Sequence, residues 1–161
     1  MHELATILGK QISDDMLVPP MLAYLDSKSD EVRTGALSNL DVFLSCISEG
    51  ERDKFIPLIE GLAKTSMLKK WRISELIAMK LGQFAQLMTE SQVKETIVPM
   101  FFKYCHEKVA SVREAASQSF GLIITKFKDN DDEVADILTH VIDEFAQCGT
   151  YTGRMVFVHM C

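Results

Sequence analysis

The sequence lacks the features of membrane-spanning, secreted and linker-rich chains. Its 161 residues include only eight glycines and four prolines, which are too few for a flexible linker or a collagen-like repeat. No apolar run approaches the ~20 residues that a membrane-spanning helix needs. The N-terminus shows no basic-then-apolar targeting pattern. We therefore expect a cytoplasmic or nuclear protein that does not bind a membrane.

Positive charge is also in short supply. Lys and Arg total 17 against 23 Asp and Glu, which gives a formal net charge of −6. Because a nucleic-acid surface needs clustered positive charge, this balance argues against nucleic acid as the partner. Hydrophobic residues, in contrast, make up 47% of the chain. That fraction is enough for an apolar core in a chain of single-domain length, and it excludes wholesale disorder.

The signatures of enzymes and metal sites are missing. Four cysteines occur without a C-x-x-C pair or a histidine at metal-finger spacing. The segment from His2 approaches the zinc motif H-E-x-x-H, but Thr6 replaces the second histidine that zinc requires. No G-x-x-x-x-G-K, G-x-G-x-x-G or G-x-S-x-G pattern is present. We therefore expect free thiols, no metal, no cofactor and no catalytic activity.

The sequence does contain an internal repeat of about 40 residues. Apolar runs follow Pro19, Pro57 and Pro99, whereas the fourth unit carries His140 at the same offset. An arginine follows each unit's apolar run, and these arginines are spaced by 39, 41 and 41 residues: Arg33, Arg72, Arg113 and Arg154. The period lies at the edge of the ~40–47 residues typical of HEAT and armadillo repeats.

Each repeat predicts two helices. The second helix of the first repeat is predicted to begin near Asp30, and its apolar residues recur with helical spacing. These residues are Val32, Ala36, Leu37, Leu40, Phe43, Leu44 and Ile47. Thr89 and Gln92 form the pattern of a capping box at another helix start. Because no strand-like alternation occurs, we predict an all-α fold, a right-handed α-solenoid of about four helical hairpins.

The repeat boundaries follow from the same spacing. We predict the tail of a preceding repeat's second helix over residues 1–10, HEAT-like repeats over 11–50, 51–89 and 90–128, and a partial repeat over 129–161. A solenoid needs polar surfaces at its two ends, because each repeat buries its apolar faces only against its neighbours. Neither end of this sequence has such a surface, so we expect an array that is truncated at both ends.

The prolines are predicted to lie inside the first helix of their repeats. A proline within a helix removes one backbone hydrogen bond and bends the helix. The alternative is that each proline marks the first turn of a helix. We favour the interior position because the apolar periodicity continues on both sides of each proline.

The turns between paired helices are predicted to lie along one edge of the stack. Trp71 is the only tryptophan, and it stands among Lys69, Lys70 and Arg72 in one of these turns. An aromatic residue beside an arginine is typical of an interface hot spot. Two interpretations remain open: Trp71 contacts a partner, or it folds inward over the core as Val32 is expected to do at the equivalent position.

The repeated arginines also have a structural interpretation. We expect Arg33 and Arg113 to bond the carbonyl groups of their turns or a carboxylate of the adjacent repeat, which would form a ladder that fixes the stack. Arg72 has exposed lysines beside it and is the better candidate for a contact with a partner.

The order and spacing of these motifs resemble the HEAT-repeat scaffold and regulatory subunits of serine/threonine protein phosphatases. The motifs are Leu17-Val18-Pro19, Asp30-Glu31-Val32-Arg33, Trp71-Arg72, Ser111-Val112-Arg113 and Gly153-Arg154. The resemblance spans essentially the whole chain. It departs from the family's pattern at Tyr151, where a tryptophan would be expected.

The resemblance implies a noncatalytic scaffold that binds a serine/threonine protein phosphatase catalytic subunit of the protein phosphatase 4 type. In this family the ridge of turns within the repeats carries the catalytic subunit. Carried over residue by residue, the partner-binding positions are Lys69, Lys70, Trp71, Arg72, Arg113 and Arg154.

Two alternatives belong to other functional classes. An armadillo- or HEAT-type adaptor for transport or cargo peptides would use Trp and Asn on the inner helix, but the residue four positions after Trp71 is Glu75. An enzyme with its active site outside these residues is the second alternative, and it would reveal itself by turnover in a longer protein. The sequence leaves the oligomeric state open.

Overall fold

All regular structure in the described part of the chain is helical. The computed structural model describes residues 1–66 and 70–161, and no strand occurs among them. Within those residues, no helix combines the length and the apolar character needed to cross a membrane. For these residues, the prediction of an all-α fold is confirmed.

The helices form two compact units, Met1–Ile77 and Ala78–Cys161. The division falls inside α8 (Trp71–Leu87), the longest helix of the described residues, so that its first turns belong to one unit and the rest to the other.

The first unit is built from paired helices. Its elements before α8 are α1 (His2–Leu8), α2 (Lys10–Ile12), η1 (Ser13–Leu17), α3 (Val18–Leu25), α4 (Asp30–Ser38), α5 (Leu40–Ser45), α6 (Glu49–Arg52), η2 (Asp53–Phe55) and α7 (Ile56–Ser66). Helix α3 packs against α4, and α1 packs against both α5 and η1. Helix α4 begins at Asp30, as the sequence predicts.

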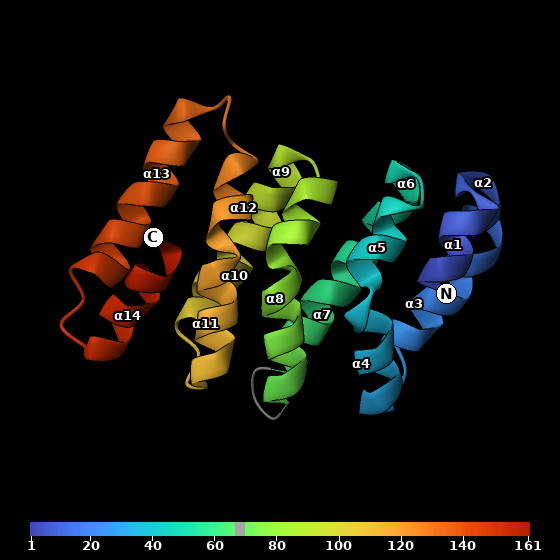
Figure 1. Cartoon of the computed structure of the whole chain (residues 1–161), viewed down its shortest axis with the longest axis horizontal. Helices are drawn as coiled ribbons and strands as arrows, with labels where there is room; N and C mark the ends of the chain where they lie inside the picture. Colours follow the sequence, from blue (N-terminus) through green and yellow to red (C-terminus); the bar gives the residue numbers. More distant parts are fainter. Residues whose placement is uncertain (67–69) are drawn as a thin grey trace. The chain divides into compact units, whose positions relative to one another are not determined.

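The second unit repeats this plan. After the end of α8 it contains α9 (Glu90–Gln92), η3 (Val93–Ile97), α10 (Val98–Cys105), α11 (Ala110–Gln118), α12 (Phe120–Thr125), α13 (Asp131–Val141), η4 (Ile142–Ala146) and α14 (Tyr151–Met160). Helix α11 packs against both α10 and α14, and α14 also packs against η4 (Figure 1).

The helical segments recur with the spacing of the sequence repeat. Four continuous helical runs begin at residues 10, 49, 90 and 131, in steps of 39, 41 and 41 residues. The second helix of each pair begins at residue 30, 71, 110 or 151. The predicted capping box starts the third run: Gln92 N–H donates to Thr89 Oγ1, and Thr89 N–H donates to Gln92 Oε1 at 3.0 Å.

Pro19 and Pro99 lie inside continuous helical runs, each one residue after a widened turn. The N–H of Val18 bonds the carbonyl of Ser13, and the N–H of Val98 bonds that of Val93, so each bond spans five residues instead of four. A proline lacks the N–H donor, and its ring crowds the carbonyl four residues earlier. The widened turn lets the helix continue past the proline, as expected for an interior position.

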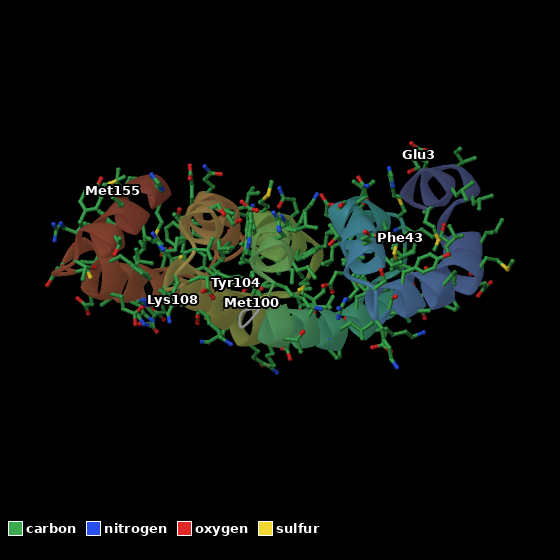
Figure 2. The ribbon with its side chains drawn as sticks, turned by 90° about the horizontal axis from the view of Figure 1, so that it is seen from below. Glu3, Phe43, Met100, Tyr104, Lys108 and Met155 are labelled. Atoms are coloured by element: carbon green, nitrogen blue, oxygen red, sulfur yellow. The ribbon has the colours of Figure 1, made fainter. Side chains whose placement is uncertain are left out.

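Aromatic side chains fill the core of each unit. In the first unit, Phe43 and Phe55 are fully buried and meet edge to face with their ring centres 5.9 Å apart. In the second unit, Phe101 stacks on Phe120, and Tyr104 is buried on the same helix as Phe101, α10. Burial of each such side chain stabilises the fold by about 1.5–3 kcal/mol. Figure 2 shows Phe43 and Tyr104 within the packing of their own units.

The prediction that Val32 belongs to the core is wrong. Val32 is 40% exposed, whereas Val112 at the equivalent position is completely buried. Both residues lie in the first turn of a second helix. Val112 is covered because α11 packs against α14 as well as α10. Val32 lies instead beside residues that line an open groove, described next, and this position leaves it uncovered.

Candidate partner-binding site

A groove in the first unit brings the turns of two successive repeats together. It has a volume of about 560 Å³. Its walls come from the start of α4 and from the start of α8: Asp30, Glu31, Thr34, Lys70, Trp71, Arg72 and Ile73. Three of the six predicted partner-binding residues therefore line one groove.

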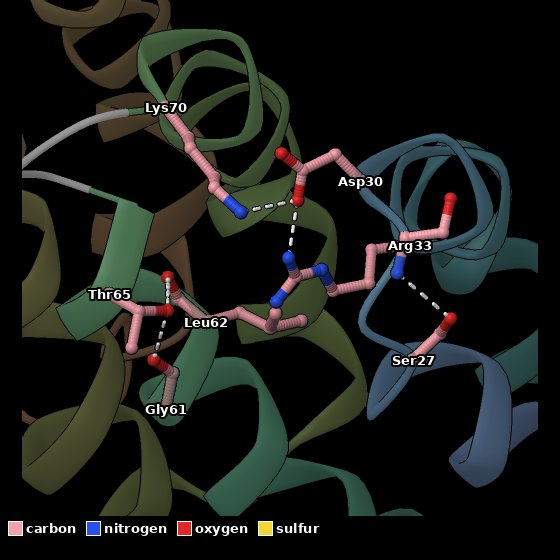
Figure 3. A network of polar contacts seen from close by, with 8 residues as sticks. Ser27, Asp30, Arg33, Gly61, Leu62, Thr65 and Lys70 are labelled. Atoms are coloured by element: carbon pink, nitrogen blue, oxygen red, sulfur yellow. Dashed lines mark hydrogen bonds and ion pairs between the residues drawn. The ribbon is translucent and has the colours of Figure 1, made fainter.

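Asp30 holds the two sides of this groove together. Its Oδ1 accepts a hydrogen bond from Lys70 Nζ at 2.6 Å and another from Arg33 Nη2 (Figure 3). The bond from Lys70, assisted by that from Arg33, holds the pKa of the Asp30 carboxyl below its ordinary value. The link between repeats that the sequence predicts is thus made by a lysine and a carboxylate, while Arg33 bonds a carboxylate of its own helix.

Trp71 lies at the groove with 41% of its surface exposed. The guanidinium carbon of Arg72 lies 4.5 Å from the centre of the indole ring, which is the geometry of a cation–π contact. Ile73, two residues further along α8, is buried and anchors the helix start in the core. Of the two interpretations that the sequence left open, this position agrees with a tryptophan that is available to a partner.

Arg113 and Arg154 fasten the turns of the second unit. Arg113 Nη1 donates to the carbonyl oxygens of Glu107 and Lys108, both at 2.8 Å. Arg154 Nη1 donates to the carbonyl oxygen of Cys148 at 2.8 Å. The expected bond from Arg113 to its turn carbonyls is therefore present. These two guanidinium groups hold their turns in shape, and their role towards a partner stays a prediction.

A second groove, of about 380 Å³, lies in the second unit between the turns 106–109 and 147–150. Its walls include Lys108, Arg113, Glu144, Phe145 and Thr152. Figure 2 shows Lys108 at the surface of this unit. The arrangement parallels that of the first unit, because a groove again lies between the turns of successive repeats.

Two residues of the second groove, His106 and Glu144, belong to a cluster that sequence reasoning missed. Nε2 of His106 lies 2.8 Å from Glu144 Oε2, and Nε2 of His140 lies 2.9 Å from Glu144 Oε1. The two imidazoles also stack on aromatic rings, His140 on Phe102 and His106 on Phe145. The bond to His106, followed by that to His140, lowers the pKa of the Glu144 carboxyl. His140 is exposed, and Glu144 is its defined partner.

Two cysteines of this groove lie in opposite environments. Burial raises the pKa of the Cys105 thiol well above its ordinary value, which makes it unreactive. The Cys148 thiol lies 3.2 Å from Thr150 Oγ1, and this hydrogen bond lowers the pKa of Cys148. All four cysteines are free, as expected. Within residues 1–66 and 70–161, no group of three or more His, Cys, Asp and Glu side chains could hold a metal ion.

One predicted position cannot be placed. Lys69 lies outside the residues that the structure describes. Tyr151, where the resemblance had led us to expect a tryptophan, begins α14 and is 70% exposed.

Comparison with known proteins finds distant relatives of the chain. No family model matches the chain. A mouse protein and a human protein are both 28% identical to it over 99% of its length, and a rat protein is 27% identical over the same share. All three carry the name serine/threonine-protein phosphatase 4 regulatory subunit 1. The chain is a distant homologue of this regulatory subunit. It spans 17% of the length of these relatives.

The homology with phosphatase 4 regulatory subunit 1 confirms the resemblance that the order of the turn motifs predicts. It extends across both compact units, since the alignment covers nearly every residue. The intra-repeat turns, with their two grooves, are therefore part of the region that the chain shares with the phosphatase 4 regulatory subunit.

Proposed function

We propose that this chain is a noncatalytic scaffold segment that binds a serine/threonine phosphatase catalytic subunit of the phosphatase 4 type. The observation that carries the proposal is the homology over the full chain with phosphatase 4 regulatory subunit 1. The segment corresponds to C-terminal repeats of that subunit, and its HEAT-like repeats, with the boundaries given above, stack as a right-handed α-solenoid.

The catalytic subunit binds along the intra-repeat turns, through Lys69, Lys70, Trp71, Arg72, Arg113 and Arg154. The fixed geometry of the described turns supports this assignment. Asp30 ties Lys70 to the neighbouring repeat, and Arg113 ties two carbonyl groups of its own turn. Because these groups are already ordered in the free protein, docking would lose little conformational entropy.

A scaffold role also fits the chemistry of the grooves. One acidic side chain of each groove has partners within the protein, Asp30 with Lys70 and Arg33, and Glu144 with two histidines. Such groups shape a surface, whereas a hydrolytic site needs an activated nucleophile or a bound metal. The chain then contributes position and surface, and the catalytic subunit contributes the chemistry.

The direct test is a titration of the purified chain with purified phosphatase 4 catalytic subunit, followed by calorimetry. We expect saturable binding with one catalytic subunit per chain. An unrelated all-helical protein of similar size and charge is the control. Saturable binding only to extended transport-type peptides, with no binding to the catalytic subunit, would favour an adaptor and overturn the proposal.

A further inference from the structure

The Arg72 guanidinium is a charged group without a polar partner. It lies over the Trp71 ring, and among the residues that the structure describes it has no hydrogen bond or ion pair. Both side chains are exposed at the first turn of α8. A guanidinium carries five N–H donors in a planar fork, so the contact with the ring leaves its hydrogen-bonding capacity unused.

One of the two acids in the groove lining, Asp30, is already neutralised. Asp30 lies in the same groove as Arg72, but its carboxylate accepts from Lys70 and Arg33 (Figure 3). In the same pair, Asp30 already balances the positive charge of Lys70. Arg72 is therefore the one basic side chain of the groove lining whose N–H groups are free, among the residues described there.

The acidic residues of the groove lining favour a singly charged anion over a doubly charged one as the partner of Arg72. Glu31, in the first turn of α4, also lines the groove and is exposed. An acidic residue in the lining repels a doubly charged phosphate more strongly than a singly charged carboxylate, because the Coulomb energy scales with the product of the two charges. A singly charged carboxylate can bond the guanidinium in the bidentate geometry, while the indole ring covers its apolar stem.

We propose that the Trp71–Arg72 pair receives an aspartate or glutamate side chain on the surface of the bound catalytic subunit. This inference rests on the proposed function, since it names the chemistry of the partner at that site. The carboxylate forms a charge-assisted pair with Arg72, and Trp71 shields the pair from water. The salt bridge between Asp30 and Lys70 keeps the groove open for it.

The test compares three variants in the titration with phosphatase 4 catalytic subunit. We expect Arg72→Gln to weaken binding about tenfold or more, because a shielded arginine is a frequent hot spot. Arg72→Lys keeps the charge but loses the bidentate contact, so it should restore only part of the affinity. Lys64→Gln is the matched control: it removes the same charge from an exposed residue of α7 that pairs with Glu60, outside the groove.

Ionic strength and cross-linking identify the partner group. The affinity of the unmodified chain should fall with added salt more steeply than that of Arg72→Gln, because one ion pair is lost. The amine of Arg72→Lys should also form an amide with an Asp or Glu of the catalytic subunit when a carbodiimide activates the carboxyl group. Mass spectrometry of the cross-linked peptides then names the acid.

The outcomes separate this inference from the proposed function. Absence of binding by the unmodified chain overturns both. Binding that is equal for Arg72→Gln and Lys64→Gln overturns the inference alone and leaves the scaffold role standing. If Arg72→Gln weakens binding but Arg72→Lys forms no cross-link to any Asp or Glu of the partner, the assignment of a carboxylate as the group that Arg72 binds is also overturned.

Discussion

Lys70 Nζ lies 2.6 Å from Asp30 Oδ1, so that residues 40 positions apart join the start of α8 to the start of α4. The same oxygen accepts a hydrogen bond from Arg33. A single carboxylate thereby connects the first turns of two second helices within the first unit. This connection sets the distance between the walls of the groove that contains Trp71.

Replacing Asp30 tests this connection. We expect Asp30→Asn to lower the stability slightly at neutral pH, because the pair is partly exposed and water screens it. Since the folded protein lowers the pKa of Asp30, the stabilising effect is present above the ordinary value of 3.8 and is lost as the pH falls through the folded-state pKa. Thermal unfolding of the unmodified chain and of Asp30→Asn at several pH values measures this difference in stability.

The neighbouring Glu31→Gln is the control for that experiment, because Glu31 is exposed in the same helical turn. A stability difference between Asp30→Asn and the unmodified chain that persists unchanged below the folded-state pKa would contradict the assignment. The effect would then come from something other than the ionised carboxylate.

Gly82 marks a close approach of α8 to α12. A Cβ at this position would lie 2.8 Å from Leu122 Cβ and 3.2 Å from the Ser119 carbonyl oxygen. We expect Gly82→Ala to destabilise the second unit by about 1–3 kcal/mol, because a tightly packed contact must open. Gly121→Ala is the matched control on α12: its Cβ meets nothing within 4 Å. It should stabilise the helix by about 0.5–1 kcal/mol. Chemical denaturation of both variants gives the comparison, and equal effects would show that the helices are not in contact there.

Arg113 is predicted to support the fold more than the binding surface. Its Nη1 donates to two carbonyl groups, so Arg113→Ala leaves both without that donor. We expect a loss of about 1–2 kcal/mol in the free energy of unfolding. Lys108→Ala removes a neighbouring cation while keeping both carbonyls and the arginine, and it should leave stability nearly unchanged. Unchanged unfolding of Arg113→Ala together with lost binding of the catalytic subunit would reverse the assignment.

The imidazole–carboxylate cluster predicts a measurable titration. The Glu144 carboxyl should titrate below its ordinary value of 4.5, mainly because of His106. We expect His106→Leu to raise the pKa of Glu144 more than His140→Leu does, and His159→Leu on α14 to have no effect. The stabilising contribution of Glu144 is present above pH 4.5 and is lost as the pH falls through its folded-state pKa. NMR titration of the Glu144 carboxyl carbon measures its pKa in each variant. An unchanged pKa of Glu144 in His106→Leu would refute His106 as the main cause of the lowered value.

Local signals in the sequence located the helices well. The capping box of Thr89 and Gln92 and the start of α4 at Asp30 depend on residues close together in the chain, so a pattern of neighbours is enough to find them. The spacing of the arginines likewise gave the period of the helical runs, because each repeat uses the same turn.

Contacts between repeats were harder to foresee. Glu144 meets His106 across 38 residues, and Lys70 meets Asp30 across 40, so no local pattern marks either pair. Only the repeat period, applied to charged residues of successive turns, could have found them. The prediction that Val32 is buried was wrong for a related reason. The position of Val32 on its helix predicts burial, but burial also requires a covering neighbour, which Val112 has and Val32 lacks.

The most direct test of the account is to measure fold and affinity together for Trp71→Ala. Because Trp71 is 41% exposed, we expect nearly unchanged helical content by circular dichroism and nearly unchanged melting. Binding to phosphatase 4 catalytic subunit should weaken by about tenfold or more, as expected for a hot-spot tryptophan. A sharp fall in melting temperature with unchanged affinity would place Trp71 in the core and contradict the assignment of the intra-repeat turns as the docking surface.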